Sequence, residues 1–282
     1  MTLRLDMLAA AEKAKNLLDD STDLVVNFTR GQINPDGAFK ARDGRSDLYY
    51  TVFGLESLLA LNGDVPGEKI LTYLHQFELG QSLDLVHLAC LIRCWADLSY
   101  KPNSKNFPDS VLRSVENLLV QQKTIYACFL ALGAFQDLNA DIPNPGNIIE
   151  IVNSLKTEDG GYANDSAIKI GSTAATAAAL TILHYLKVPP PNSAVDWMLS
   201  RCQKTGGFAA IPEAPVPDLL STATALHGLT LTGVSTDNIK EQCLDFIDSL
   251  WDGKGAFYAT WADEIPDCEY TYYALLALGH LS

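Results

Sequence analysis

Basic residues are scarce in this sequence. Its 282 residues include 20 Lys and Arg against 34 Asp and Glu, which gives a formal net charge of −14. Proteins that bind nucleic acid or anionic lipid meet the phosphate groups with cationic side chains, and an excess of acidic side chains opposes that contact. The composition therefore excludes nucleic acid as a partner.

Paired cysteines and an apolar leader are missing as well. The six cysteines, at positions 90, 94, 128, 202, 243 and 268, form no Cys-x-x-Cys pair, which argues against a zinc ribbon. The first 18 residues alternate leucines with charged residues, so they predict an amphipathic helix rather than a secretion signal. We therefore expect reduced thiols and a cytoplasmic protein.

No apolar run is long enough to suggest a membrane span. The most hydrophobic helical segment, Thr173 to Tyr185, is rich in Ala and Thr and falls short of the ~20 apolar residues that a bilayer requires. With 48% hydrophobic residues, a chain of this length can bury a large core in one domain. We expect a soluble protein that is not transmembrane.

What the sequence does contain is helical periodicity in pairs. Short breaks rich in Gly, Pro and Asn separate segments whose apolar residues recur at helical spacing. After the leading helix, six pairs are predicted, at 22–30 with 47–62, 67–79 with 84–99, 109–122 with 124–138, 146–156 with 171–186, 191–204 with 219–232, and 236–251 with 268–281.

The second helices of the pairs share a pattern. They can be aligned on one anchor residue each: Tyr50, His87, Ala127, Ser172, Ser221 and Tyr270. Seven residues after the anchor every copy has a small residue, and eight residues after it every copy has a large apolar one. A helix with a small side next to a bulky side can approach like neighbours closely and bury its bulky side against an outer layer. The pattern suits the inner helices of a closed ring.

The ring is expected to close on itself. A period of about 40–50 residues is typical of helical arrays, and open arrays need polar end repeats. Here the last segment, Tyr270 to Leu278, is as apolar as any inner helix. We therefore predict an all-α fold, an (α/α)6 barrel or toroid of six helical hairpins, as a single domain over residues 1–282 with an extra N-terminal helix.

The loops inside the pairs carry a second repeated signal. A glycine is followed by an aromatic residue ten to thirteen residues before an anchor, at Gly37-Ala38-Phe39, Gly160-Gly161-Tyr162, Gly206-Gly207-Phe208 and Gly255-Ala256-Phe257. Glycine permits tight turns, and the aromatic ring can fill the gap between neighbouring hairpins. We interpret these loops as structural.

These features together resemble a known superfamily. Glycine-aromatic loops, the string Asp-x-x-Tyr-Thr at residues 47–51 and 267–271, and Ala/Leu-rich inner helices are similar to those of the α/α toroid shared by protein prenyltransferase β subunits and class II terpenoid cyclases. The resemblance covers nearly the whole chain after residue 20. It implies the fold more firmly than an activity, because the repeats belong to the scaffold.

The resemblance implies a set of site residues. Arg42 and Arg45 match the basic pair that holds the prenyl diphosphate, whose leaving-group charge cations neutralise. Asp47 matches the zinc carboxylate and Tyr50 the tyrosine of the same motif, while His87, in an Asp-x-x-His string, matches the zinc histidine. The expected catalytic residues are Asp47, Tyr50 and His87, with Asp47 and His87 as metal ligands.

The sequence departs from the superfamily's patterns at three points. Tyr49 stands where a zinc-binding cysteine belongs, so the zinc ligand set is incomplete, and the last hairpin offers Glu269 at the corresponding position. No Asp-x-Asp-Asp string of the class II cyclases occurs. The residues 19–23 spell a diphosphate motif of a different fold, and we interpret Asp20, Ser21 or Asp23 as a helix cap.

Helix capping is also the alternative for the acidic residues of the inner helices. Asp47, Asp84, Asp218 and Asp267 all lie three residues before their anchors. An aspartate at that place accepts backbone hydrogen bonds and favours the positive end of the helix dipole. Capping explains these residues without a metal.

Aromatic residues are expected to face the interior of the barrel. Rings at inward positions can surround an isoprenoid chain and attract a carbocation. The alternative is that the same side chains fill the ring completely. The residues concerned are Tyr49, Tyr50, Phe53, Tyr126, Phe129, Tyr270 and Tyr273.

The functional expectation is a protein that binds an isoprenoid, as a prenyl diphosphate or another apolar small molecule. It would be a prenyltransferase-like or terpenoid-cyclase-like enzyme, with zinc as the cofactor that the resemblance implies. The alternative is a noncatalytic toroid that binds a lipid or a partner protein. The resemblance to prenyltransferase β subunits also implies a protein partner.

Overall fold

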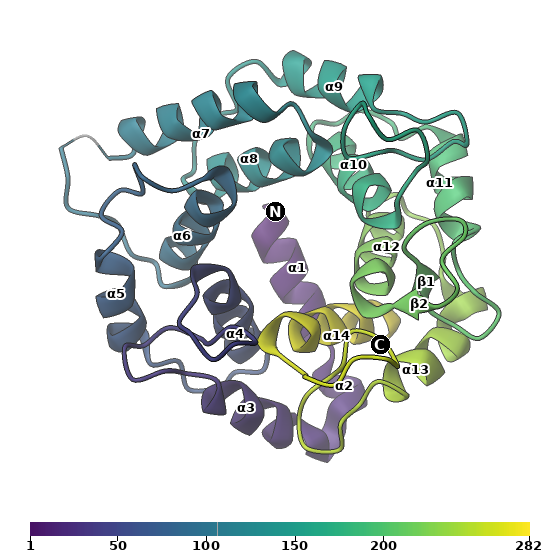
Figure 1. Ribbon diagram of the computed structural model, residues 1–282, viewed down its shortest axis with the longest axis horizontal. Coiled ribbons are helices and arrows are strands. Elements are labelled where there is room, and N and C mark those ends of the chain that lie inside the picture. Colours follow the sequence, from purple (N-terminus) through teal and green to yellow (C-terminus); the bar gives the residue numbers. More distant parts are fainter. Residues whose placement is uncertain (106) are drawn as a thin grey trace.

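The computed structural model describes residues 1–105 and 107–282, and it is a ring of helices in two concentric layers (Figure 1). The inner layer consists of α4 (Leu48–Ala60), α6 (Leu85–Asp97), α8 (Ile125–Asp137), α10 (Thr173–Tyr185), α12 (Leu219–Leu231) and α14 (Cys268–Leu281). The outer layer consists of α3 (Thr22–Gly31), α5 (Gly67–His75), α7 (Asp109–Gln122), α9 (Pro145–Ser154), α11 (Asn192–Leu199) and α13 (Lys240–Asp248).

Each inner helix packs against the next, and α14 packs against α4. The ring is therefore closed, and the predicted all-α (α/α)6 toroid of six helical hairpins is confirmed. The only regular strands in the described part are two short ones, β1 (Phe208–Ala209) and β2 (Pro217–Asp218), which pair antiparallel. The outer helices are shorter than predicted at several places, because residues such as 76–79 and 200–201 form turns.

All six inner helices begin with a side-chain cap. The capping oxygen accepts a hydrogen bond from the backbone N–H three residues on, at distances between 2.7 Å for Asp218 and 3.3 Å for Ser172. The capping residues are Asp47, Asp84, Thr124, Ser172, Asp218 and Asp267. The capping interpretation of the four aspartates is confirmed.

Two sequence interpretations at helix starts are wrong. Ser172 is itself the cap of α10, so the residue equivalent to the other anchors is Ala175, and our alignment of that helix was three residues early. Three residues is nearly one helical turn, so the alternation of small and large residues looked similar in the shifted register. Before α3, a short 3-10 turn, η1 (Asp19–Ser21), ends at Ser21, which occupies the cap position but makes no capping side-chain hydrogen bond.

The glycine-aromatic loops form one repeated turn. In each, the backbone N–H of the aromatic residue donates to the hydroxyl of the threonine four residues after the helix cap, as from Phe208 to Thr222 Oγ1 at 2.9 Å. The other pairs are Phe39 with Thr51, Tyr162 with Thr176, and Phe257 with Thr271. Because all four aromatic rings are buried, each loop is fixed to its inner helix by packing and by this bond.

Gly37 shows why the turn requires glycine. Its φ is +97°, and a Cβ there would lie 2.2 Å from the carbonyl oxygen of Lys69 on the next hairpin. That combination of left-handed backbone and close approach admits no side chain. The structural interpretation of the loop agrees with this geometry.

The threonine bond provides a test of the turn. Thr222→Val keeps the side-chain volume and leaves the buried N–H of Phe208 without its acceptor, so we expect a loss of about 1–3 kcal/mol in the free energy of unfolding. Thr230→Val is the matched control, because Thr230 is exposed and its hydroxyl only donates to the Leu226 carbonyl within the helix. Equal stability losses in the two variants, measured by urea denaturation, would contradict the structural role of Thr222.

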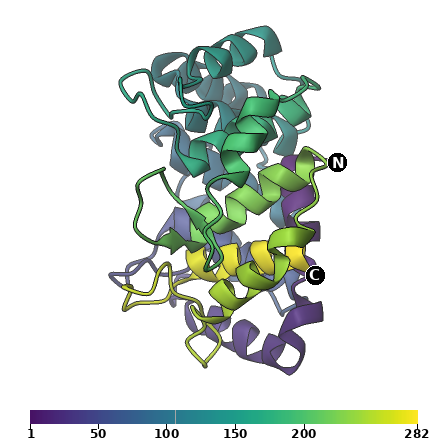
Figure 2. The same ribbon diagram turned by 90° about the vertical axis from the view of Figure 1, so that its right-hand side faces the viewer.

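The N-terminal segment closes one end of the ring. The single helix predicted over residues 1–18 is divided into α1 (Leu3–Glu12) and α2 (Lys15–Leu18). In Figures 1 and 2, α1 lies across the ring at the end that also carries the C-terminus, opposite the loops that precede the inner helices. It packs against α14, α4 and α8, and its Leu3 N–H donates to Gln136 Oε1 at 2.8 Å.

The remaining element is a second 3-10 turn, η2 (Asp237–Ile239), which precedes α13. All six cysteines are free, as the sequence predicts. Within the described residues, no helix combines the length and the apolar character needed to cross a membrane.

Candidate functional site

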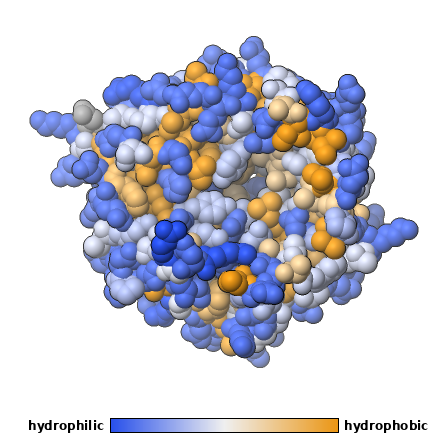
Figure 3. Space-filling view, in the orientation of Figure 1, coloured by the Kyte–Doolittle hydropathy of each residue, from blue (hydrophilic) through white to orange (hydrophobic). Residues whose placement is uncertain are grey.

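A cavity of about 250 Å³ lies inside the ring of inner helices. Its floor is formed by Leu3 and Met7 of α1, so a ligand enters from the opposite end, where the inner helices begin. Figure 3 shows the molecule hollowed within the ring on that face, with apolar residues beside the hollow. The cavity is therefore a pocket with one closed end rather than a channel.

The repeat arranges the cavity wall in layers. Three residues after the anchor, with Ala175 as the anchor of α10, every inner helix contributes a lining residue: Phe53, Cys90, Leu130, Ala178, Thr224 and Tyr273. Six residues after the anchor every helix contributes another: Glu56, Arg93, Gly133, Thr181, His227 and Leu276. A rise of 1.5 Å per residue places the second layer ~4.5 Å deeper than the first. The upper layer is mostly apolar and the lower one is mostly polar.

The structure places five of the seven predicted cavity aromatics on this wall: Tyr49, Phe53, Tyr126, Phe129 and Tyr273. The rings pack edge to face or tilted, with centroids 4.9 Å apart for Tyr49 and Phe53 and 5.4 Å apart for Phe53 and Tyr273. Tyr272 also lines the cavity, although the sequence reading passed it over. The wall on the side of α4 and α14 is thus largely aromatic.

Tyr50 and Tyr270 are not among the residues that line the cavity. The guanidinium carbon of Arg42 lies 5.3 Å from the centre of the Tyr270 ring. Tyr50 also lies close to Arg42, at the rim of the cavity. Both rings belong to the surroundings of Arg42 rather than to the interior.

The cavity tyrosines remain uncharged at neutral pH. Burial raises the pKa of Tyr126 to about 12 and raises the pKa of Tyr49 further. The Tyr49 hydroxyl donates to Glu269 Oε1 at 2.7 Å, and the neighbouring carboxylate adds to that rise. The rings therefore present neutral π faces, which attract positive charge on a ligand.

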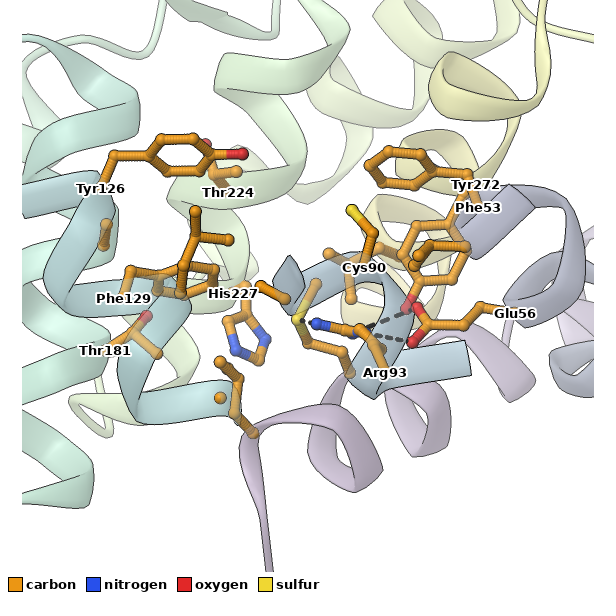
Figure 4. A pocket seen from close by; sticks show the side chains of 18 of the residues that line it. Phe53, Glu56, Cys90, Arg93, Tyr126, Phe129, Thr181, Thr224, His227 and Tyr272 are labelled. Carbon is orange, nitrogen blue, oxygen red and sulfur yellow. Dashed lines mark hydrogen bonds and ion pairs between the residues drawn. The ribbon is translucent and has the colours of Figure 1, made fainter. Parts of the chain in front are cut away.

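The cavity floor carries a cluster of five charged side chains, Arg4, Glu56, Arg93, Asp97 and Asp137. Figure 4 shows the pair of Glu56 and Arg93. Arg93 donates through Nε and Nη2 to both oxygens of Glu56, with Nη2 3.1 Å from Oε2. Arg4 of α1 joins two further carboxylates, with Nη1 2.9 Å from Asp97 and Nε 3.0 Å from Asp137. Glu56, Arg93 and Asp137 line the cavity directly.

This cluster has three carboxyl groups and two guanidinium groups. Burial, and then the charge of Glu56, raise the pKa of Asp97 well above its usual range, and burial also raises the pKa of Asp137. Asp97 is completely buried, and its Oδ2 has no hydrogen-bond partner among the described residues. A low-dielectric site disfavours the one unbalanced negative charge, which favours the protonated form of a carboxyl in this cluster.

The raised pKa of Asp97 predicts a pH-dependent effect of one substitution. A carboxyl whose pKa is raised by folding holds its proton more tightly in the folded state, so its contribution to stability falls as pH rises above its unfolded pKa of ~3.9. Asp97→Asn mimics the protonated form and can still accept from Arg4. We expect its free energy of unfolding, relative to the unmodified protein, to become steadily more favourable from pH 5 to pH 8. A difference that does not change with pH would contradict the raised pKa of Asp97.

Two histidines lie beside this cluster. His227 Nδ1 is 3.0 Å from His280 Nε2, so one of the two rings donates to the other. Burial lowers the pKa of His227 to about 3 and that of His280 to about 4. Both rings are therefore neutral at physiological pH, and the His227 ring adds no charge to the cavity.

The residues predicted to bind zinc do not form a metal site. Asp47 Oδ1 accepts from the Tyr50 N–H at 3.0 Å as the cap of α4, and the His87 ring lies 2.9 Å from Asp84 at a partly exposed position. No group of three or more His, Cys, Asp or Glu side chains in the described part of the chain is arranged to hold a metal ion. Zinc does not fit these residues, and we derive no chemical step from it.

The two arginines predicted to hold a diphosphate are paired with carboxylates. Arg42 donates to Asp267 at 2.6 Å and to both oxygens of Asp263 at 2.7 and 3.0 Å, so all three of its nitrogens are engaged. Arg45 pairs with Asp43, and its side chain is 86% exposed. The two guanidinium groups therefore point to different partners.

Comparison with known proteins supports the fold. The described ring superposes on a variant of the type II terpene cyclase MstE from Scytonema in complex with its substrate geranylgeranyl dihydroxybenzoate, with a TM-score of 0.63 at 13% identity over 95% of this chain and 97% of that one. Another variant of that cyclase, with the product merosterolic acid A, gives a TM-score of 0.61 at 13% identity over the same shares. Identities this low establish a common fold and nothing finer.

A protein geranylgeranyltransferase-I from Candida albicans complexed with GGPP also matches, at 15% identity over 96% of this chain and 81% of that chain, with a TM-score of 0.49. A search of the curated proteins found no match.

The family is shown by the sequence itself. The family model of the prenyltransferase alpha-alpha toroid domain matches residues 106–192 and 186–282, which together make up more than half of the chain. The structure agrees with that match, because it has a closed ring, six capped inner helices and four glycine-aromatic turns. The chain belongs to the prenyltransferase α/α toroid domain family.

Proposed function

We propose that the protein binds an isoprenoid in its central cavity and acts on it as a terpenoid-cyclase-like enzyme. The observation that carries the proposal is the cavity itself, which is closed at one end, aromatic on one wall and mostly apolar in its upper layer. Apolar pockets with a few polar groups are the usual form of small-molecule sites. An isoprenoid chain matches both the apolar wall and the single entrance.

The surroundings of the entrance favour an uncharged isoprenoid over a prenyl diphosphate. Arg42 is fully engaged by Asp263 and Asp267, and Glu269 lies next to Tyr49 at the rim. A diphosphate would have to displace these carboxylates or bind beside them, and like charges repel. We infer that binding of a diphosphate is weaker than binding of the corresponding alcohol.

Acid-initiated cyclisation is the reaction that these features support. Asp137 belongs to the carboxyl cluster at the floor and lines the cavity, and burial raises its pKa, which favours the acid form. Transfer of a proton to a substrate alkene leaves a carbocation, which neutral aromatic rings stabilise by cation–π attraction. The superfamily's usual cyclase acid motif is missing from this chain, so the proposed acid differs from it in position.

The proposal is tested by filling the cavity. Ala178 lies on the wall of α10, and Ala178→Phe places a ring in the space that the ligand would occupy. We expect farnesol to raise the melting temperature of the unmodified protein and to lose most of this effect in Ala178→Phe. Ala262→Phe is the control, because Ala262 is exposed in the loop before α14. If farnesol stabilises all three proteins equally, the cavity is not its binding site.

Noncatalytic binding is the second candidate. It is favoured by the zinc ligands that do not assemble and by the paired state of Arg42 and Arg45. Incubation with uncharged polyprenyl substrates followed by proton NMR of the recovered lipid separates the two, since a cyclase yields an isomer of the same mass with fewer alkene protons and a binding protein returns the substrate unchanged.

A further inference from the structure

Arg93 is the one cationic side chain among the described residues that line the cavity. It projects from the lower layer, and Figure 4 shows its guanidinium between Glu56 on one side and His227 on the other. Its Nε and Nη2 are occupied by Glu56, and Nη2 also lies 3.7 Å from the sulfur of Met7. These contacts occupy one edge of the guanidinium.

The other nitrogen, Nη1, has no acceptor in the described part of the chain. Neither Asp97 nor Asp137 forms an ion pair with Arg93, although both belong to the same cluster. Nη1 is not among the buried polar atoms without a partner, and 16% of the Arg93 side chain is accessible. Because Arg93 lies deep in the ring and lines the cavity, that accessible part faces the cavity.

The charges around Arg93 determine which ligand groups can accept a hydrogen bond from Nη1. Its own charge is balanced by Glu56, and Asp137 lies on the same floor. An anion placed there would be removed from water and would meet two carboxyl groups, which is unfavourable without a cation of its own. An uncharged oxygen with a lone pair satisfies the free N–H without adding charge.

The depth of the site sets the orientation of the ligand. Tyr49 lies at the upper end of the cavity and Glu56, which holds Arg93, lies seven residues further along α4. At 1.5 Å per residue this places the backbone of Glu56 ~10 Å deeper than that of Tyr49. The wall between the two levels is aromatic and aliphatic, so a ligand that reaches Arg93 passes its oxygen through an apolar section first.

We propose that the ligand is an uncharged oxygenated isoprenoid that enters oxygen-first and accepts a hydrogen bond from Arg93 Nη1. This rests on the proposed function and names the substrate class more narrowly: a terpenoid alcohol, ketone or ether, rather than a hydrocarbon or an acid. The hydrocarbon chain then lies along the aromatic wall towards the entrance.

The test compares three ligands of equal chain length: farnesol, the hydrocarbon without the hydroxyl group, and farnesoic acid as its carboxylate at pH 7. Because a hydrogen bond to a charged group in a dry site is worth a factor of about 10 to 100 in affinity, we expect the alcohol to bind that much more tightly than the hydrocarbon. We expect the carboxylate to bind more weakly than the alcohol. Titration of the full chain by calorimetry gives all three affinities.

A variant removes the donor without leaving a buried charge. In Glu56→Leu/Arg93→Met both partners of the ion pair become apolar, so we expect the alcohol to lose its advantage over the hydrocarbon while the hydrocarbon still binds. Equal affinities of alcohol and hydrocarbon in the unmodified protein overturn the inference, whether or not the variant folds. Tightest binding of the carboxylate also overturns it.

The outcomes separate this inference from the proposed function. If none of the three ligands binds the unmodified protein, the proposed isoprenoid function fails. If the hydrocarbon binds and Ala178→Phe prevents it, the cavity takes isoprenoids and only the role of Arg93 is wrong. A preference for the alcohol that persists in Glu56→Leu/Arg93→Met places the hydrogen bond elsewhere and likewise overturns the inference.

Discussion

Glu56→Leu is expected to lower the free energy of unfolding by about 3–5 kcal/mol, because it leaves the buried Arg93 guanidinium without its counter-charge. Arg93→Met should cost a similar amount, since the Glu56 carboxylate is then unpaired at a position with no exposed surface. Both substitutions preserve side-chain volume approximately, so the loss reports on charge rather than on a cavity. Urea denaturation followed by circular dichroism measures it.

The double variant distinguishes an unpaired charge from damaged packing. A buried ion pair replaced by apolar residues of similar size is often neutral or stabilising, so Glu56→Leu/Arg93→Met should recover most of the stability lost in either single variant. A double variant as unstable as the sum of the two single variants would show that the side chains contribute mainly by shape. The account of the cavity floor as an electrostatic cluster would then be wrong.

Gly279→Ala is expected to displace α1 from the end of the ring. A Cβ at Gly279 would lie 1.8 Å from the carbonyl oxygen of Ala10 and 2.5 Å from its carbonyl carbon, and both are backbone atoms that no side-chain rotation can move. Overpacking of this kind costs about 1–3 kcal/mol or more. Because α1 forms the floor of the cavity, its displacement should also weaken the binding of any ligand held there.

Hydrogen exchange measured by mass spectrometry follows this displacement directly. The amides of α1 should exchange faster in Gly279→Ala. The exchange rates of α10 and α12 should change less, because α1 packs mainly against α14, α4 and α8. Gly31→Ala is the control, because a Cβ at Gly31 meets nothing within 4 Å and its φ is not positive. That variant should be neutral or stabilised by up to ~1 kcal/mol. Unchanged exchange of α1 in Gly279→Ala would show that the close packing at this position is unimportant.

The fold could be read from the sequence because it is repeated. Six helix starts have Asp, Ser or Thr at the cap, and five of these helices have a small residue followed by a large one on the same face, so the same signal is given several times over. The apolar last helix indicates closure. The error in α10 arose because its start has no Asp and because a shift of three residues nearly preserves a helical pattern. The break between α1 and α2 depends on packing across the end of the ring, which no local pattern contains.

The interior polar residues were missed, although the same alignment contained a signal for them. Glu56, Arg93 and His227 stand six residues after their anchors on helices that are otherwise apolar, and that position faces the cavity in every repeat. An alignment that is compared only for small and large residues does not reveal the position six residues after each anchor. Charged residues that recur at one inward column are a better indication of the site than the motif at the entrance.

The entrance arginines illustrate what the sequence could not provide. Arg42 was matched to a diphosphate-binding residue by its place in a motif, but its partners Asp263 and Asp267 lie more than two hundred residues away in the chain. They meet only because the last hairpin packs against the first. The charge that a basic residue offers to a ligand depends on such distant partners, which the ring closure brings together.

The most direct test of the central claim is photo-crosslinking with farnesol that carries a diazirine on its chain, followed by peptide mapping. If the ring holds an isoprenoid, the label is found on cavity-facing segments of α4, α8 and α14, and it is displaced by unlabelled farnesol. A label confined to the outer helices or to the exposed loops, or one that unlabelled farnesol does not displace, would contradict the account.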